Sequence, residues 1–303
     1  MKSGCGWLRL VALLAASGVL LPGPSLAGES GPCGEGLELR LSSRQPAQGS
    51  LVVVEVVGAS PLSALRAEAS GQALHFWQDA NPENRYRALL GVDLERQPGG
   101  LPLAVEAELA GGARPGCRAL VSVQDGRFAL ERLELPRRFV ELSARDLERA
   151  EREAQRLREL FARVSPERLW AGGFRLPVED REAAGNFGRR RVLNNQPRSP
   201  HSGEDFPGPA GTPVVAAQRG RVVLAEELFF SGNTVVLDHG LGLYTFYGHL
   251  ESIAVEPGRV VEAGTLLGRL GATGRVSGPH LHWAARLNRA RVNPRDLVAL
   301  LPD

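Results

Sequence analysis

Lysine is almost absent from this chain of 303 residues, in which the single example is Lys2. Because Lys2 lies in a segment with the features of an export signal, the chain that remained after cleavage would contain no lysine. Enzymes that form a Schiff base with a carbonyl substrate need a lysine side chain, and so does any lysine-attached prosthetic group. The sequence therefore excludes both from the mature protein.

Long hydrophobic runs are also scarce. The apolar run Leu10–Leu21 is shorter than the roughly 20 residues that a membrane-spanning helix needs. Lys2 and Arg9 precede it, and the small residues Ser25 and Ala27 follow at an A-x-A-like cleavage site. This layout predicts a secretory signal peptide over residues 1–27, with an uncleaved N-terminal anchor as the alternative. No later segment is long and apolar enough to span a bilayer, so no integral membrane segment is expected after cleavage.

Neither sign of charge is in excess. The sequence has 36 Lys and Arg residues against 34 Asp and Glu, and loss of Lys2 and Arg9 with the signal peptide would make the chain formally neutral. Proteins that bind nucleic acid through phosphate contacts depend on a basic excess. Nucleic acid is therefore not an expected partner.

Cysteine is rare as well, with three residues in total. Cys5 lies in the predicted signal peptide, which leaves Cys33 and Cys117 in the mature chain. An even pair in an exported protein favours a disulfide, with two free buried thiols as the alternative. Neither cysteine lies near another type of metal ligand in the sequence.

Turn residues divide the first half of the chain into short segments rich in β-branched or alternating apolar residues. These segments predict an N-terminal Ig-like β-sandwich over residues 28–136, with strands at 50–58, 85–94, 101–112 and 118–126. Apolar residues at helical spacing then predict an amphipathic helical connector within residues 137–172, with Ser143 as its N-cap and Pro166 near its end. Residues 173–303 are again β-rich and contain many glycines, so the chain as a whole is predicted to be mainly β.

Histidine is concentrated in that last part, which contains five of the six in the chain. His201 and Asp205 form an H-x3-D pair, His249 follows three aromatic residues, and His280 and His282 form an H-x-H pair. Alternate residues of a strand point to the same face, so the H-x-H pair would enter one cleft. Two histidines and one aspartate suit a catalytic zinc ion, and His201, Asp205 and one member of the H-x-H pair would complete the set. The other member and His249 would then stand at the wall of the cleft.

The stretches HSGEDFPGPAGTPVVAAQRGRVV, GNTVVLDHGLGLYTFYGHL and PGRVVEAGTLLGRLGATGRVSGPHLHW resemble the lysostaphin-type, or LytM-domain, zinc metallopeptidases in order and spacing. The resemblance covers about the last 130 residues and implies a β-rich domain built as a split barrel or antiparallel sheet. It implies one zinc ion held by His201, Asp205 and His282. It further implies that His280 is the general base and that His249 orients water or stabilises the oxyanion. In the mechanism expected from it, His280 takes the proton of the zinc-activated water and passes it to the leaving amine, while His249 stabilises the tetrahedral oxyanion. His239 in LDHGLG also fits the family pattern, and we interpret it as structural.

The resemblance implies an exported zinc metalloendopeptidase that cuts peptide bonds in bacterial peptidoglycan, with the periplasm favoured over the cell exterior. A non-catalytic or latent LytM-domain regulator of other cell-wall hydrolases is the alternative, and the complete ligand set argues against it. The stretch PGRVVEAGTLLGRLG resembles the hairpin of biotinyl and lipoyl carrier domains. Such a domain attaches its cofactor through a lysine, and the mature chain would contain none, so this alternative is excluded. The N-terminal domain would inhibit the enzyme, recognise a regulatory protein partner, or space the enzyme from the membrane.

Overall fold

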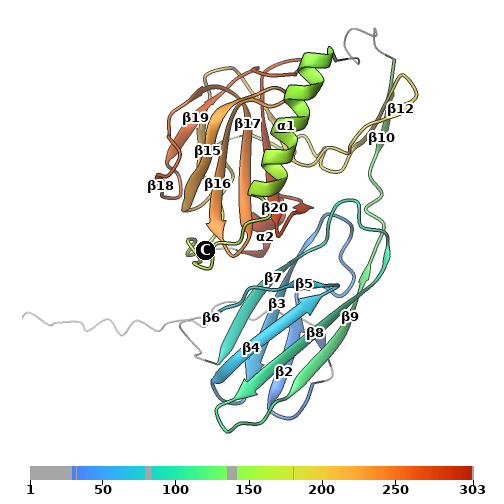
Figure 1. The fold of residues 1–303 in the computed structure, drawn as a ribbon, viewed down its shortest axis with the longest axis vertical. Helices are drawn as coiled ribbons and strands as arrows, with labels where there is room; N and C mark the ends of the chain where they lie inside the picture. The colour runs from blue at the N-terminus through green and yellow to red at the C-terminus, as the bar shows by residue number, and fades with distance from the viewer. Residues whose placement is uncertain (1–28, 32, 79–83, 135–141, 180, 302–303) are drawn as a thin grey trace, which may run out of the picture.

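A computed structural model describes residues 29–31, 33–78, 84–134, 142–179 and 181–301 of the chain. Two β-rich parts lie one above the other in Figure 1, and a single long helix lies across the upper part. The mainly β class predicted from the sequence is confirmed. The predicted signal peptide, residues 1–27, and the predicted boundary at residues 136 and 137 lie outside the described residues.

The N-terminal part consists of two antiparallel sheets. One has the order β1-β2-β3-β7-β6 and the other the order β5-β4-β8-β9. Their strands are β1 (Glu29–Gly31), β2 (Leu37–Leu41), β3 (Leu51–Gly58), β4 (Leu62–Ala69), β5 (Gln72–Ala73), β6 (Trp77–Gln78), β7 (Arg85–Gly91), β8 (Gly99–Leu109) and β9 (Gly116–Val123). Leucine and valine side chains from both sheets pack into one core, as the alternation of buried and exposed residues along β8 requires. The predicted sandwich and its four strands are confirmed.

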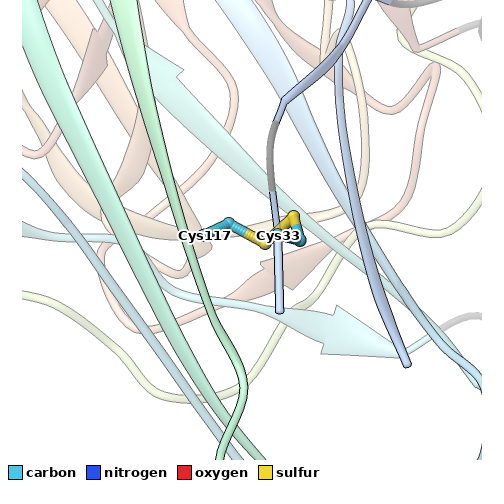
Figure 2. Close-up of a disulfide and its surroundings, with 2 residues drawn as sticks. All are labelled: Cys33 and Cys117. Atoms are coloured by element: carbon cyan, nitrogen blue, oxygen red, sulfur yellow. A yellow bond between two sulfur atoms is a disulfide. The ribbon is translucent and has the colours of Figure 1, made fainter. Parts of the chain in front are cut away.

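A disulfide closes the sandwich near its N-terminal end. Cys33 and Cys117 are bonded across an isolated antiparallel bridge between the segment after β1 and strand β9, and Cys117 is buried in the sandwich core (Figure 2). The bond encloses 84 residues and confirms the pairing that the sequence favoured over two free thiols.

Helix α1 (Ala144–Leu160) is the predicted connector helix. The Ser143 side chain accepts a hydrogen bond from the backbone N–H of Asp146, which confirms Ser143 as the N-cap. The helix ends six residues before Pro166. Leu157, Leu160 and Phe161 pack on the large C-terminal sheet against Leu224, Leu228, Val236 and Tyr244. Within the part of the chain that the structure describes, no helix is both long enough and apolar enough to cross a membrane.

The C-terminal part is built on a sheet of nine strands with the central order β13-β20-β17-β16-β15-β18. Its elements are β13 (Glu204–Pro207), β14 (Pro213–Val215), β15 (Gly220–Leu228), β16 (Gly232–Gly240), β17 (Leu243–Ile253), β18 (Val260–Val261), β19 (Leu266–Leu270), β20 (His280–Leu287), β21 (Ala290–Val292) and the short helix α2 (Arg295–Leu300). Every strand pair in this sheet is antiparallel. Strand β20, which begins with the H-x-H pair, lies between β13 and β17, so its side chains face residues from both neighbours.

The two β-rich parts share a hydrophobic core. Leu51, Val53, Trp77 and Leu89 of the sandwich pack in the same cluster as Trp170, Leu287 and Val292. The backbone N–H of Leu51 donates to the Asp296 carboxylate at 2.9 Å, and Arg291 forms an ion pair with Asp93 at 2.6 Å. The sandwich is therefore packed directly on the domain that contains the histidines.

A third, small sheet connects the two parts near the H-x3-D segment. Strand β10 (Leu130–Leu133), which follows the sandwich, pairs in parallel with β11 (Arg190–Leu193), and β11 pairs with β12 (Gln196–Pro197). Phe128 packs edge-on against Phe187, with ring centroids 6.1 Å apart. The chain that leaves the sandwich thus contacts the loop that leads into His201.

Candidate metal centre and catalytic groups

Strand register brings Asp205 and His282 together. Asp205 on β13 lies directly opposite His282 on β20, and Gly248 on β17 lies opposite His282 on the other side. A Cβ on Gly203 would lie 2.7 Å from atoms of the His282 ring, so the ring needs a glycine at that position. His280 lies two residues before His282 and therefore on the same face of β20, as the sequence predicted.

His201 reaches the same point from the loop ahead of β13. Its backbone N–H donates to the Arg189 carbonyl at 2.9 Å, and its own carbonyl accepts from the Gly188 N–H at 2.8 Å. These two bonds pair the short segment at His201 with residues 188–189. The two bonds form a strand-like ladder, which fixes the backbone that carries the His201 ring.

The three predicted metal ligands form a nearly equilateral triangle. His201 Nε2 lies 3.0 Å from His282 Nδ1 and 3.1 Å from Asp205 Oδ1, and His282 Nδ1 lies 2.9 Å from Asp205 Oδ1. Zinc bonds to nitrogen and oxygen are about 2.0–2.2 Å long, so ligand atoms of a tetrahedral site lie roughly 3.3 Å apart. Their side chains are 12–16% exposed, which leaves one side open to solvent and substrate. The three groups are thus at the separation that one small cation requires.

The hydrogen bonds around the triangle also fit a cation. His201 Nδ1 lies 3.1 Å from the Asn186 carbonyl oxygen, which can only accept, so this nitrogen carries the proton. In the neutral imidazole, Nε2 then presents its lone pair toward Asp205 Oδ1 and His282 Nδ1. A nitrogen lone pair and a carboxylate oxygen repel each other at this distance, and a positive ion bound between them would remove the repulsion.

Asn186 is a functional residue that the sequence reasoning missed. Its side-chain Nδ2 donates to Asp205 Oδ2 at 2.8 Å, and its Oδ1 accepts from the Asp205 backbone N–H at 3.1 Å. Its carbonyl accepts from His201, and its backbone N–H donates to the buried carboxylate of Glu204 at 2.9 Å. Asn186 therefore holds two of the three ligands. The one local signal is a single amide residue in the segment NFG ahead of His201.

His280 and His249 stand beside the triangle. His280 Nε2 lies 3.8 Å from Asp205 Oδ1, and the rings of His249 and His280 have centroids 4.8 Å apart. The His249 backbone has a positive φ of 64°, a conformation that is strained for this residue type and is held by a bond from its N–H to the Ser231 carbonyl at 2.7 Å. All five predicted site residues therefore gather in one place.

Backbone carbonyls set the tautomers of these two histidines. His280 Nδ1 lies 2.9 Å from the Gly278 oxygen, and His249 Nδ1 lies 3.0 Å from the Thr273 oxygen. Both Nδ1 atoms therefore donate, and each neutral ring presents a lone pair at Nε2. Such a ring accepts a proton or a hydrogen bond from water, whereas it donates to an oxyanion only after it has been protonated.

Burial and neighbouring charge adjust the ionisation of the site. Burial, together with the nearby His282, lowers the pKa of His249 to about 4, so His249 is neutral at pH 7. Burial also lowers the pKa of His282. Burial raises the pKa of Asp205, but the neighbouring imidazoles of His201 and His282 outweigh this and hold it well below its usual range. Asp205 is therefore present as a carboxylate and His282 as a neutral imidazole, the forms in which these groups bind a metal.

His239 lies in the core and not at the site. It is fully buried, with Nδ1 at 2.8 Å from the Arg219 carbonyl and Nε2 at 2.7 Å from Thr245 Oγ1. Both ring nitrogens are therefore occupied, which agrees with the structural interpretation. His75, the sixth histidine, lies in the loop between β5 and β6 of the sandwich.

Residues 199–294 match the model of peptidase family M23. A Pseudomonas aeruginosa protein of known crystal structure, provisionally assigned as a peptidase M23, is 31% identical with a TM-score of 0.64, over 84% of this chain and 95% of that one. Vibrio cholerae ShyA, named a peptidoglycan DD-endopeptidase, is 40% identical over 121 residues, which are 39% of this chain and 28% of ShyA. Neisseria meningitidis Mpg, named a DD-carboxypeptidase/endopeptidase, is 38% identical over 103 residues, which are 34% of this chain and 24% of Mpg. The matched region is about a quarter of the length of these two relatives.

Proposed function

We propose that this chain, which belongs to peptidase family M23, is a zinc-dependent endopeptidase that hydrolyses peptide bonds of bacterial peptidoglycan. The observation that carries the proposal is the triangle of His201 Nε2, Asp205 Oδ1 and His282 Nδ1, with His280 and His249 beside it. The peptidoglycan substrate is supported by the names of ShyA and Mpg, to which 39% and 34% of this chain are similar.

His201, Asp205 and His282 would hold the metal ion. Two imidazoles and one carboxylate with an open side are a ligand set that suits catalytic zinc, whereas calcium and magnesium prefer oxygen ligands. When bound, zinc would polarise the scissile carbonyl and make a water molecule easier to deprotonate.

His280 would move the proton. Its Nε2 carries the lone pair that can accept a proton from the attacking water, because its Nδ1 donates to the Gly278 carbonyl. Once protonated at Nε2, the ring can deliver that proton to the nitrogen of the leaving amine as the peptide bond breaks. The hydrogen bond from Nδ1 to the carbonyl of Gly278, just before β20, keeps the ring in one orientation through both steps.

His249 would orient the water. The resemblance implied either orientation of water or stabilisation of the oxyanion for His249, and the mechanism expected from the sequence used the second. A neutral ring with its proton on Nδ1 accepts a hydrogen bond at Nε2, and a pKa lowered by burial to about 4 opposes the protonation that the oxyanion role requires. This favours His249 as the acceptor for the hydrogen of the attacking water that His280 does not take.

We further propose that the chain is exported and acts in the periplasm. The Cys33–Cys117 disulfide supports an oxidising compartment, since disulfides rarely persist in a reducing cytoplasm. Residues 1–27 keep their interpretation as a signal peptide. A regulatory protein partner of the sandwich domain also remains a proposal.

Single substitutions of the ligands and of the base distinguish metal binding from proton transfer. Asp205→Ala and His282→Ala should lose bound zinc and activity together, because each removes one of three ligands. His280→Ala should keep zinc and lose turnover by about 10²- to 10⁴-fold, the usual contribution of a general base. Metal content by mass spectrometry and release of soluble peptides from purified peptidoglycan measure the two properties, with Arg259→Gln beside β18 as an exposed control.

Retained turnover in His280→Ala would contradict its role as base. Stoichiometric zinc in the unmodified chain without release of peptides would favour the regulator alternative over the enzyme. Absence of zinc and of any other bound divalent metal from the folded chain would contradict the metal site itself.

A further inference from the structure

Two turns hold His249 between them. The turn Phe229–Ser231 connects β15 to β16, and its Ser231 carbonyl accepts the backbone N–H of His249 at 2.7 Å. The turn after β19 contains Thr273, whose carbonyl lies 3.0 Å from His249 Nδ1. Whatever these two turns present to solvent therefore borders the catalytic groups.

The first turn is fixed from outside by α1. Glu153 of the helix accepts the backbone N–H of Phe229 at 2.7 Å, and the guanidinium of Arg149 lies 5.8 Å from the centre of the Phe229 ring. Phe229 is thereby half-buried. Phe230, the next residue, has 47% of its surface exposed although it is a large apolar side chain.

The two turns are joined tightly to each other. The N–H of Arg275 donates to the Phe230 carbonyl at 2.9 Å, and the N–H of Asn233 donates to Thr273 Oγ1 at 2.9 Å. Gly232 and Gly274 both have positive φ, and a Cβ on either would lie 2.3 Å from backbone atoms of the opposite turn. The close approach requires glycine at both positions, so the side chains of the two turns are held in a constant arrangement.

Together the turns present an arginine stacked on an aromatic ring. The guanidinium carbon of Arg275 lies 5.9 Å from the centre of the Phe230 ring, and Arg275 is exposed. Among the described residues, Arg275 forms no ion pair. A stacked guanidinium keeps the N–H donors at its edge free, and those donors match the two oxygens of a carboxylate.

We propose that Phe230 and Arg275 form a substrate subsite that binds a carboxylate carried on an aliphatic arm of the peptide. The Phe230 ring would cover the aliphatic arm, and the Arg275 guanidinium would bind the carboxylate. The inference rests on the proposed function and narrows its substrate class to peptides that carry a free carboxylate next to the bond that is cut. It adds to the ligands and the base a pair of residues that select the substrate.

The experiment uses cross-linked peptides that differ in one group. In a matched set, each free carboxylate is replaced in turn by the neutral amide. Binding is measured by fluorescence anisotropy with the full zinc-loaded chain carrying His280→Ala, and kcat/KM is measured with the unmodified chain. One amidated peptide should bind about five- to tenfold more weakly than its parent, as expected for an exposed charge-assisted pair. The same peptide should show the loss mainly in KM.

Substitution of Arg275 should remove the discrimination. Arg275→Gln should bind the parent and that amidated peptide equally, Arg275→Lys should retain part of the preference, and Arg259→Gln should retain all of it. The inference would be overturned if the chain with intact Arg275 bound every amidated peptide as tightly as the parent peptide. It would also be overturned if Arg275→Gln kept the full preference for the parent over the amidated peptide. Because binding is measured without turnover, this result is distinct from failure of the unmodified chain to cleave any peptide, which would count against the proposed function.

Discussion

Replacement of Asn186 by alanine tests whether the metal centre depends on a residue outside its ligand set. The substitution removes two side-chain hydrogen bonds, both to Asp205, and leaves the backbone bonds to His201 and Glu204 in place. Asn186 is 7% exposed, so water does not readily replace the lost donor. Asp205 would then be free to rotate away from the position at which its Oδ1 meets the two histidines.

The size of the effect follows from the bond that is lost. A hydrogen bond to a charged group contributes about 1.5–3 kcal/mol, and the Nδ2 bond to Asp205 Oδ2 is of this kind. Loss of a residue that orients a ligand typically weakens metal binding by about 10- to 100-fold, which is about 1.4–2.7 kcal/mol. The two estimates agree, so we expect the Kd for zinc to rise by about 10- to 100-fold in Asn186→Ala.

The assay is competition for zinc between the folded chain and a chromophoric chelator. Arg198→Ala is the control, since Arg198 lies exposed in the segment that leads into His201 and is hydrogen-bonded to Gln196 rather than to a ligand. Circular dichroism at the assay temperature establishes that both variants are folded. A folded Asn186→Ala chain that binds zinc within about threefold of the unmodified chain would refute the reasoning.

Two further predictions concern stability. Replacement of Cys33 and Cys117 by serine should lower the free energy of unfolding by about 4 kcal/mol, since the bond closes a loop of 84 residues, and should leave zinc affinity unchanged. Chemical denaturation measures the first property, and a loss below about 1 kcal/mol would contradict the estimate. Burial lowers the pKa of His239 to about 4, so the unfolded chain binds its proton first and stability should fall by about 2 kcal/mol as the pH falls from 7 to 5. His239→Gln should lack this part of the pH dependence in urea denaturation, and an equal slope in both chains would show that His239 does not titrate on unfolding.

Much of the site was predictable because the signals are local. In His280-Leu-His282, the two-residue period of a strand places both rings on one face wherever the strand lies. The N-cap at Ser143 follows in the same way from four consecutive residues. Residue chemistry alone also limited the function, since Lys2 is the one lysine and its expected loss with the signal peptide would exclude two classes of protein without any knowledge of the fold.

Other features depend on contacts between distant segments. The alignment of Asp205 with His282 depends on the register of two strands that are 77 residues apart in the sequence. Asn186, which is hydrogen-bonded to His201 and Asp205, lies in a loop 15 to 19 residues before them. Sequence patterns report how residues repeat along the chain, but they do not report which backbone atoms of separate segments meet. For this reason Asn186 was missed, and the sequence did not indicate which nitrogen of His249 meets the carbonyl of Thr273.

The sequence by itself determined the β-rich class and the capped helix, because each depends on residue type and short-range spacing. It indicated the cysteine pair from their number, and the five groups of the site from residue type and from the resemblance of their segments to a known family. Tertiary structure alone decided that the sandwich shares a core with the catalytic domain, through Leu51, Trp77 and Leu89. It also decided that Phe230 and Arg275, 45 residues apart, stack beside His249. The physical reason is that burial and stacking stabilise contacts between residues that are close in space, whatever their separation in the sequence. Gly232 and Gly274 have no Cβ atoms, so the β15–β16 and β19–β20 turns can approach closely enough to make these contacts.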